Sequence, residues 1–263
     1  MTNAMDYPLL VFAISFLGLS LSAWIGKSFS KRQQTLPSEA AEGFSVVQAA
    51  TLTLLGLIIG FTFSMALGRY DQRKNCEAAE ANAVGTEYLR VDLLPAADAA
   101  KLRVLLLDYL DQRVFFYDTR DVQRLLQIEA LNAKLQAELW SAVHTPAIEQ
   151  AGPVAALAVA GMNDVLNSQG YTQAAWWNRI PTAAWILMAA IAICSNVLIG
   201  FKTRSNRPVL LLILPFVISI AFLLIADIDE PRGGLIRMIP RNLINLSQSL
   251  HTSSSPGTWM PRD

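Results

Sequence analysis

Four long apolar runs limit what this chain can fold into. A helix needs roughly 20 residues to cross about 30 Å of hydrocarbon, and each run is close to that length with no Asp, Glu, Lys, Arg or His inside it. Backbone N–H and C=O groups in lipid must be bonded within the segment, so each run is predicted to be a membrane-spanning helix. The predicted spans cover residues 8–25, 46–68, 181–201 and 208–226.

The first run could instead be a cleaved signal peptide, because small apolar residues stand near its end. A signal peptide, however, carries basic residues before its apolar stretch. Here Asp6 is the only charge before the run, whereas Lys27, Lys31 and Arg32 follow it. We therefore predict a retained helix.

Between the second and third spans the chain becomes polar, charged and rich in helix-forming residues. Residues 77–94 contain no proline and only an isolated glycine, so the second span is predicted to continue as one long helix. After Pro95, apolar residues recur at three- and four-residue spacing over 97–117, with charged residues such as Arg113 between them. A similar pattern covers 122–140. Both patterns are typical of amphipathic helices.

Two features suggest where this middle segment turns. A helix break is predicted at Thr145-Pro146, with His144 as a polar residue beside it. A further helix follows and leads back to the membrane through Trp176 and Trp177, because tryptophan favours the bilayer interface.

The predicted fold is all-α, a polytopic membrane protein with four transmembrane helices and a helical soluble domain inserted between the second and third. The expected segments are the first helix pair (1–68), the soluble domain continuous with the second span (69–180), the second helix pair (181–228), and an acidic, Pro-Gly-containing turn and tail (229–263).

Composition argues against several classes of function. The chain has 21 basic and 21 acidic residues, so no net charge favours nucleic acid. Cys76 and Cys194, with His144 and His251, are too few and too scattered for a disulfide framework or a zinc site. No phosphate loop or nucleophile motif occurs, so we expect no metal, no cofactor and no enzyme. Spans without ionisable groups also argue against a proton-coupled carrier.

The second span carries a stripe of small residues at four-residue spacing. Such a stripe allows another helix to approach the backbone closely. That partner could belong to the same chain or to another subunit. The helix-packing stripe consists of Gly56, Gly60, Ser64 and Gly68.

An adjacent face of the same span repeats Thr53, Leu57 and Phe61, again four residues apart. The line could face lipid or the core of the protein. If several copies of the helix surrounded an axis, the line would instead form stacked rings that narrow a pore and gate it by dewetting.

Charged residues gather where the second and the fourth spans end. Three carboxylates follow the fourth span and could bind a cation or pair with basic residues at the membrane surface, such as Arg232, Arg237 and the 69–74 segment. The candidate charge cluster comprises Arg69, Asp71, Arg73, Asp227, Asp229 and Glu230.

Two segments resemble the bestrophins. Residues 60–74, Gly-Phe-Thr-Phe-Ser-Met-Ala-Leu-Gly-Arg-Tyr-Asp-Gln-Arg-Lys, followed by helix through Asn82, are similar to the stretch where the bestrophin pore helix leaves its neck. Residues 227–233, Asp-Ile-Asp-Glu-Pro-Arg-Gly, are similar to the turn after the fourth helix of that family. The Gly-Leu-Ile-Arg sequence ending at Arg237 resembles bacterial bestrophin-like membrane proteins.

This resemblance implies a homopentamer in the lipid bilayer, with an axial pore for inorganic ions and neck rings at Thr53, Leu57 and Phe61. It also implies a bacterial inner-membrane location with the inserted domain and both termini cytoplasmic; the charge bias alone does not decide, since six basic residues on one side face seven on the other.

The chain also departs from the family. Eukaryotic bestrophins bind calcium through acids just after the Pro-Gly turn, where this chain has residues 235–238, Leu-Ile-Arg-Met. In addition, Thr53 makes one of the neck rings polar.

The leading hypothesis is a bestrophin-like ion channel. The alternative is a non-conducting membrane scaffold or sensor whose soluble helices bind a partner.

Overall fold

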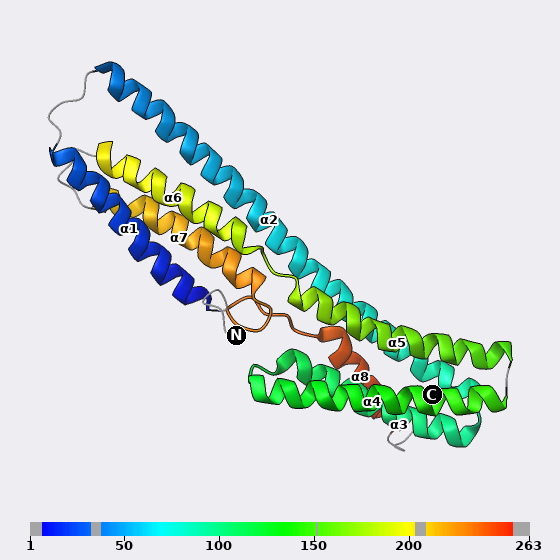
Figure 1. Ribbon diagram of the computed structural model, residues 1–263. Coiled ribbons are helices and arrows are strands. Elements are labelled where there is room, and N and C mark those ends of the chain that lie inside the picture. The colour runs from blue at the N-terminus through cyan, green and yellow to red at the C-terminus, as the bar shows by residue number, and fades with distance from the viewer. Residues whose placement is uncertain (1–6, 33–37, 151, 203–208, 255–263) are drawn as a thin grey trace, which may run out of the picture. The chain divides into compact units, whose positions relative to one another are not determined.

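The computed structural model describes residues 7–32, 38–150, 152–202 and 209–254, and the regular elements among them are helices. By contacts the chain forms two compact units: Met1–Tyr70 with Arg179–Arg237, and Asp71–Asn178 with Met238–Asp263. The long helix α2 (Figure 1) contributes residues to both units. The helices are α1 (Pro8–Arg32), α2 (Ser38–Arg90), the 3₁₀ turn η2 (Val91–Leu93), α3 (Ala96–Asp118), α4 (Val122–Glu149), α5 (Pro153–Trp177), α6 (Thr182–Lys202), α7 (Val209–Asp229) and α8 (Arg241–Ser254).

Four helical stretches in the described residues are long and apolar enough to cross a membrane. The first three stretches contain the first three apolar runs and the fourth covers residues 211–226 of the last run, so the prediction of an all-helical chain with four candidate spans is confirmed. The predicted start of the fourth span at Pro208 lies outside the described residues. The stretches are Pro8–Phe29, Gly43–Leu93, Pro153–Lys202 and Leu211–Asp229.

In the first unit, α1 lies against both α6 and α7 (Figure 1). Their shared core includes Leu19 of α1, Met188 of α6 and Ile225 of α7, which are all at most 3% exposed. The first part of α2 adds Leu55 and Ala66 to the same core. Membrane helices gain little from hydrophobic transfer on association, so close van der Waals packing of this kind must hold them together.

Two glycines bring α1 and α6 into backbone contact. A Cβ atom placed on Gly26 of α1 would overlap the carbonyl oxygen of Val197, and one placed on Gly200 of α6 would overlap that of Ala23. Only hydrogen in place of the side chain allows this crossing. Regular spacing drew attention to the glycines of α2, whereas this pair has no such spacing and was not predicted.

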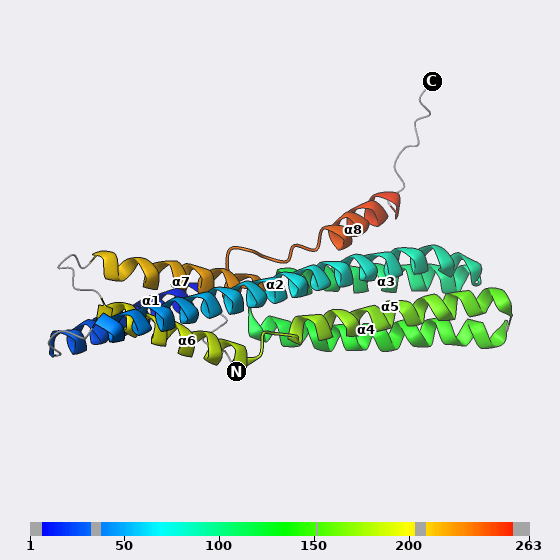
Figure 2. The same cartoon turned by 90° about the horizontal axis from the view of Figure 1, so that it is seen from above.

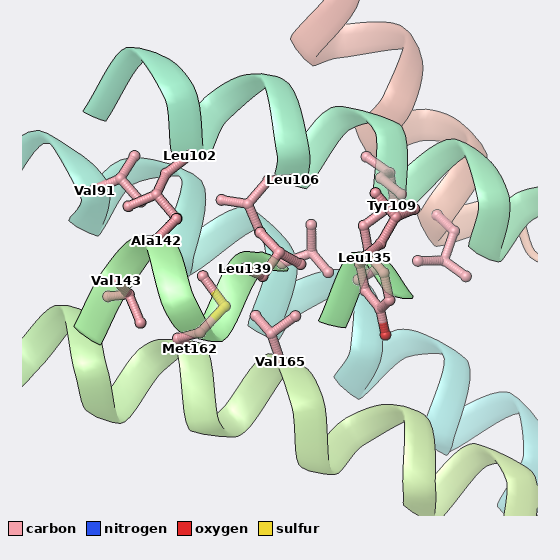
Figure 3. Packing of buried hydrophobic residues seen from close by; sticks show 14 of the residues in the cluster. Val91, Leu102, Leu106, Tyr109, Leu135, Leu139, Ala142, Val143, Met162 and Val165 are labelled. Atoms are coloured by element: carbon pink, nitrogen blue, oxygen red, sulfur yellow. The ribbon is translucent and has the colours of Figure 1, made fainter. Parts of the chain in front are cut away.

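The second unit packs α3, α4, α5 and α8 with the last part of α2 (Figure 2). Leu106 of α3, Leu139 of α4 and Met162 of α5 lie together in its core (Figure 3), and none of the three has exposed surface. The predicted amphipathic stripes of α3 and α4 thus supply part of this core, although Val122 and Leu126 of the α4 stripe are exposed.

A buried ion pair also joins three helices of this unit. Glu80 of α2 accepts hydrogen bonds from Arg113 of α3, from Tyr117 at 3.3 Å and from Thr172 of α5 at 2.9 Å. Glu80 and Arg113 are at most 1% exposed. Burial would lower the pKa of Arg113, but the neighbouring Glu80 carboxylate raises it overall, so the guanidinium stays charged. Sequence periodicity had placed Arg113 among the polar positions of its helix.

The predicted helix break at Thr145-Pro146 is wrong. Pro146 lies inside α4, which ends three residues later, and its carbonyl accepts a hydrogen bond from the Gln150 N–H at 3.0 Å. A proline removes one N–H donor and crowds the carbonyl four residues earlier. Because Pro146 stands in the last turn, few later hydrogen bonds depend on it.

Two further expectations need correction. Trp176 packs in the core of the second unit, with its ring centroid 5.2 Å from that of Phe116, so its side chain faces protein, whereas Trp177 is 73% exposed. The supposed tail contains α8, whose N-terminus is held by Glu77: its carboxylate accepts from Asn242 at 2.6 Å and from the Leu243 N–H at 2.9 Å. A carboxylate there satisfies otherwise unpaired N–H groups.

Candidate functional site: the exposed face of α2 and the acidic turn after α7

The first part of α2 has a buried side and an exposed side. Leu55, Thr62 and Ala66 recur at four- and seven-residue spacing, and all are at most 3% exposed. The predicted line of Thr53, Leu57 and Phe61 lies on the exposed side, where Leu57 is 53% and Phe61 65% exposed. Within one chain these side chains therefore cover no core.

The small-residue stripe also faces open space. No described atom beyond the helix itself lies within 4 Å of a Cβ built on Gly56, Gly60 or Gly68, and Ser64 is exposed. In the described residues of one chain, no other helix therefore packs on this stripe. The remaining alternatives are a second copy of the chain and lipid.

At the end of α7, Asp229 binds two residues that precede α6 and one residue of α2. It accepts a hydrogen bond from Arg179 Nε at 3.1 Å and from the Ile180 N–H at 3.2 Å, and it lies 3.7 Å from Arg69 Nη1. Glu230 forms a second ion pair with Arg179 at 2.7 Å. Asp229 and Glu230 are less than 8% exposed, but the Arg179 side chain is 29% exposed, so these contacts are partly shielded from water and salt.

The third acid, Asp227, fixes the turn that follows. Its two oxygens accept the N–H groups of Leu235 at 2.7 Å and Ile236 at 2.8 Å. Just before them Gly234 has φ of +74°, which only glycine adopts without strain, and a Cβ there would overlap Asp227 itself. The Pro-Gly turn is thus wrapped around a buried carboxylate.

The six predicted cluster residues are divided between the units. Arg69, Asp227, Asp229 and Glu230 belong to the first, where the three acids are buried. The other two belong to the second: Asp71 is exposed, and Arg73 is buried with its Nε 3.4 Å from the Ala175 carbonyl.

Arg179, which in the sequence is only one basic residue among many, is the main partner of the acids. One feature of the sequence could have identified Arg179. It stands two residues before Pro181, at the start of a helix, where a positive charge is unfavourable unless a nearby acid compensates it. The carboxylate oxygens face protein donors, so this arrangement favours structural pairing over a cation site.

Replacing Asp229 with asparagine is expected to destabilise the first unit by about 2 kcal/mol, because charge-assisted hydrogen bonds of this kind contribute about 1.5–3 kcal/mol each. Thermal unfolding in detergent measures the effect. Asp71→Asn is the matched control, since Asp71 is exposed. Equal melting temperatures for the two variants would show that the pairing at Asp229 does not stabilise the fold.

The four candidate spans, the glycine crossing of α1 with α6 and the exposed apolar face of α2 define an α-helical membrane protein. The sequence profile of the Bestrophin-like domain matches residues 13–243. The chain belongs to the Bestrophin-like family, which confirms the resemblance drawn from the second span and the acidic turn. A comparison with curated protein sequences gave no match.

Solved structures show the same fold at low sequence identity. A bacterial bestrophin homologue from Klebsiella pneumoniae is 15% identical, with a TM-score of 0.63 over 91% of this chain and 98% of that one. A substituted form of that homologue is 12% identical, with a TM-score of 0.65 over 96% of this chain and 100% of that one. The likeness therefore extends over both units.

Proposed function

We propose that this chain forms an oligomeric ion channel, a homopentamer whose pore is lined by α2 and narrowed at Leu57 and Phe61. The observation that carries the proposal is the exposed apolar line on α2. A side chain such as Phe61, 65% exposed, suits either lipid or the axis of an oligomer, and membership of the Bestrophin-like family favours the axis.

The small-residue stripe fits the same arrangement. Gly56, Gly60 and Gly68 present bare backbone with nothing packed on it among the described residues of the chain, so a helix from a neighbouring copy could approach closely there. Leu57 and Phe61 from several copies would then form apolar rings, which hold back ions by excluding water until the rings widen. Thr53 would add a polar ring one turn away.

The proposed location is the bacterial inner membrane, with the second unit and both termini in the cytoplasm. This part of the proposal rests on family analogy. The second unit has an apolar core of its own and charged outer positions such as Asp71 and Lys101, which suit water better than lipid.

The oligomeric state is the first experiment. Particle imaging of the protein in mild detergent is expected to give five-fold symmetry with α2 nearest the axis. A monomer, a dimer or an axis closed by other helices would overturn the channel proposal. Such a result would favour the non-conducting scaffold or sensor.

Phe61→Ala is expected to raise ion flux into liposomes several-fold, because removing the largest ring residue lowers the dewetting barrier. Phe63→Ala is the matched control: Phe63 is on the same helix, 38% exposed, and off the line. A stopped-flow flux assay compares the two. Flux that stays at the level of empty liposomes in every variant would contradict a conducting pore.

A further inference from the structure

One buried carboxyl group in the second unit has no hydrogen-bond partner. Glu87 of α2 has no exposed surface, and neither of its oxygens has a partner among the described residues. The other buried glutamates on this part of the helix differ, because Glu77 accepts hydrogen bonds from α8 and Glu80 from α3 and α5. A buried charge without donors is unfavourable, so Glu87 does not serve the same structural role.

The Glu87 carboxyl group lies against the backbone of α5. A Cβ placed on Gly161 would overlap Glu87 Oε2 and would stand 2.7 Å from Arg90 Nη1. Gly161 is thus the position where α5 accommodates the acid. Three apolar residues close to these positions in sequence, Val91 on η2 and Met162 and Val165 on α5, are fully buried in the core of the same unit (Figure 3).

Two charged groups act on Glu87: Arg90 from its own helix and Asp164 from α5. Burial raises the pKa of Glu87, Arg90 lowers it and Asp164 raises it, which leaves a pKa of about 8. Glu87 is nineteen residues beyond Gly68, the predicted end of the second span. At 1.5 Å per residue it is roughly 28 Å further along the helix, outside the membrane-spanning segment.

We propose that the contact between Glu87 on α2 and Gly161 on α5, hereafter the Glu87 contact, is controlled by protonation. With the carboxyl group neutral, α5 packs closely on α2. Loss of the proton leaves a charge without donors, and the contact opens to admit water to the carboxylate. This goes beyond the proposed channel function and does not depend on it, although α2 is also the helix proposed to line the pore.

The direction of the pH effect follows from linkage. In the open contact Glu87 is hydrated and has its usual pKa near 4.5, whereas in the closed contact the pKa is about 8. The closed contact therefore binds the proton more tightly and is fully stable below pH 4.5. Between pH 4.5 and 8 the opening constant rises by up to about tenfold per pH unit, and above pH 8 it levels off.

Hydrogen–deuterium exchange of the full chain in detergent tests the proposal without measuring ion flux. Protection factors of the α5 amides around Gly161 are expected to fall between pH 5 and 8 and then to level off. In Glu87→Gln they are expected to stay constant, because the amide does not ionise. Glu149→Gln, at an exposed acid of α4, is the matched control and is expected to follow the unmodified protein.

Two further variants cover the case in which Glu87→Gln folds poorly. Asp164→Asn, at an exposed position, removes a negative charge that raises the pKa, so the levelling-off is expected at lower pH. Gly161→Ala is expected to reduce protection at every pH, since the new methyl group displaces Glu87. Constant protection in the unmodified protein from pH 5 to 8, or an unchanged pH profile in Glu87→Gln, would overturn the proposal.

Discussion

Replacing Arg113 with methionine is expected to destabilise the second unit by about 3–5 kcal/mol. The change leaves Glu80 as a buried charge without its ionic partner, and loss of one member of a buried pair has a cost of that size. Tyr117 and Thr172 would still donate to Glu80, but two neutral donors do not compensate a full charge. Burial and the Glu80 carboxylate both raise the pKa of Tyr117, so its hydroxyl remains a donor.

Thermal unfolding in detergent tests this expectation. For a chain of this size the loss corresponds to a fall in melting temperature of roughly 6 to 20 °C. Arg124→Met is the matched control, because Arg124 is an exposed arginine of the same unit. In a double variant with Glu80→Leu, stability is expected to recover in part, since the uncompensated charge is gone. An Arg113→Met protein as stable as the control would refute the role of the pair.

The apolar runs and the amphipathic helices could be located from the sequence because both depend on local periodicity. The four spans needed only length and the absence of charge, and the core of α3 needed only three- and four-residue spacing. Arg113 shows the limit of that reasoning. Its partner is 33 residues away, and a cation among polar positions is expected to be solvated unless a tertiary contact buries it.

The errors at Pro146 and in the tail have a similar cause. A proline usually ends a helix, but near the C-terminus of a helix it removes few backbone hydrogen bonds. The α4 helix therefore continues past Pro146 to Glu149, and Gly152 caps the start of the next helix. The α8 segment is polar overall and has few apolar residues of its own. It is helical because Leu243 is fully buried and Glu77 caps its first turn, and both depend on another helix.

In the candidate site, too, local features could be predicted from the sequence and contacts between distant residues could not. Spacing alone identified the stripe and the line on α2, and the described residues of a single chain leave both without a covering partner. It did not identify Arg179, because the pairing with Asp229 joins residues fifty positions apart. The glycines give a second example. The regularly spaced glycines of α2 could be found in the sequence, whereas Gly26 of α1 and Gly200 of α6, which bring two backbones into contact, have no regular spacing that would identify them.

Gly200→Ala is expected to destabilise the first unit by about 3 kcal/mol or more. Overpacking usually costs about 1–3 kcal/mol when side chains can shift, but here the new methyl group meets the backbone carbonyl of Ala23, which has no rotamer to change. The α1 and α6 helices must separate, and Met188 and Ala192, fully buried residues earlier on α6, are expected to lose packing.

Unfolding of the detergent-solubilised protein compares this variant with Gly18→Ala, the matched control. Gly18 is on α1, and no described atom beyond the helix lies within 4 Å of the place that an alanine methyl group would take, so alanine should be neutral or slightly stabilising through its higher helix propensity. Gly60→Ala should resemble that control in the isolated chain but weaken the proposed oligomer. If Gly200→Ala and Gly18→Ala unfold alike, the α1–α6 crossing is not as close as the structure places it. If only Gly60→Ala changes the oligomer, the stripe on α2 acts between chains while Gly26 and Gly200 act within one.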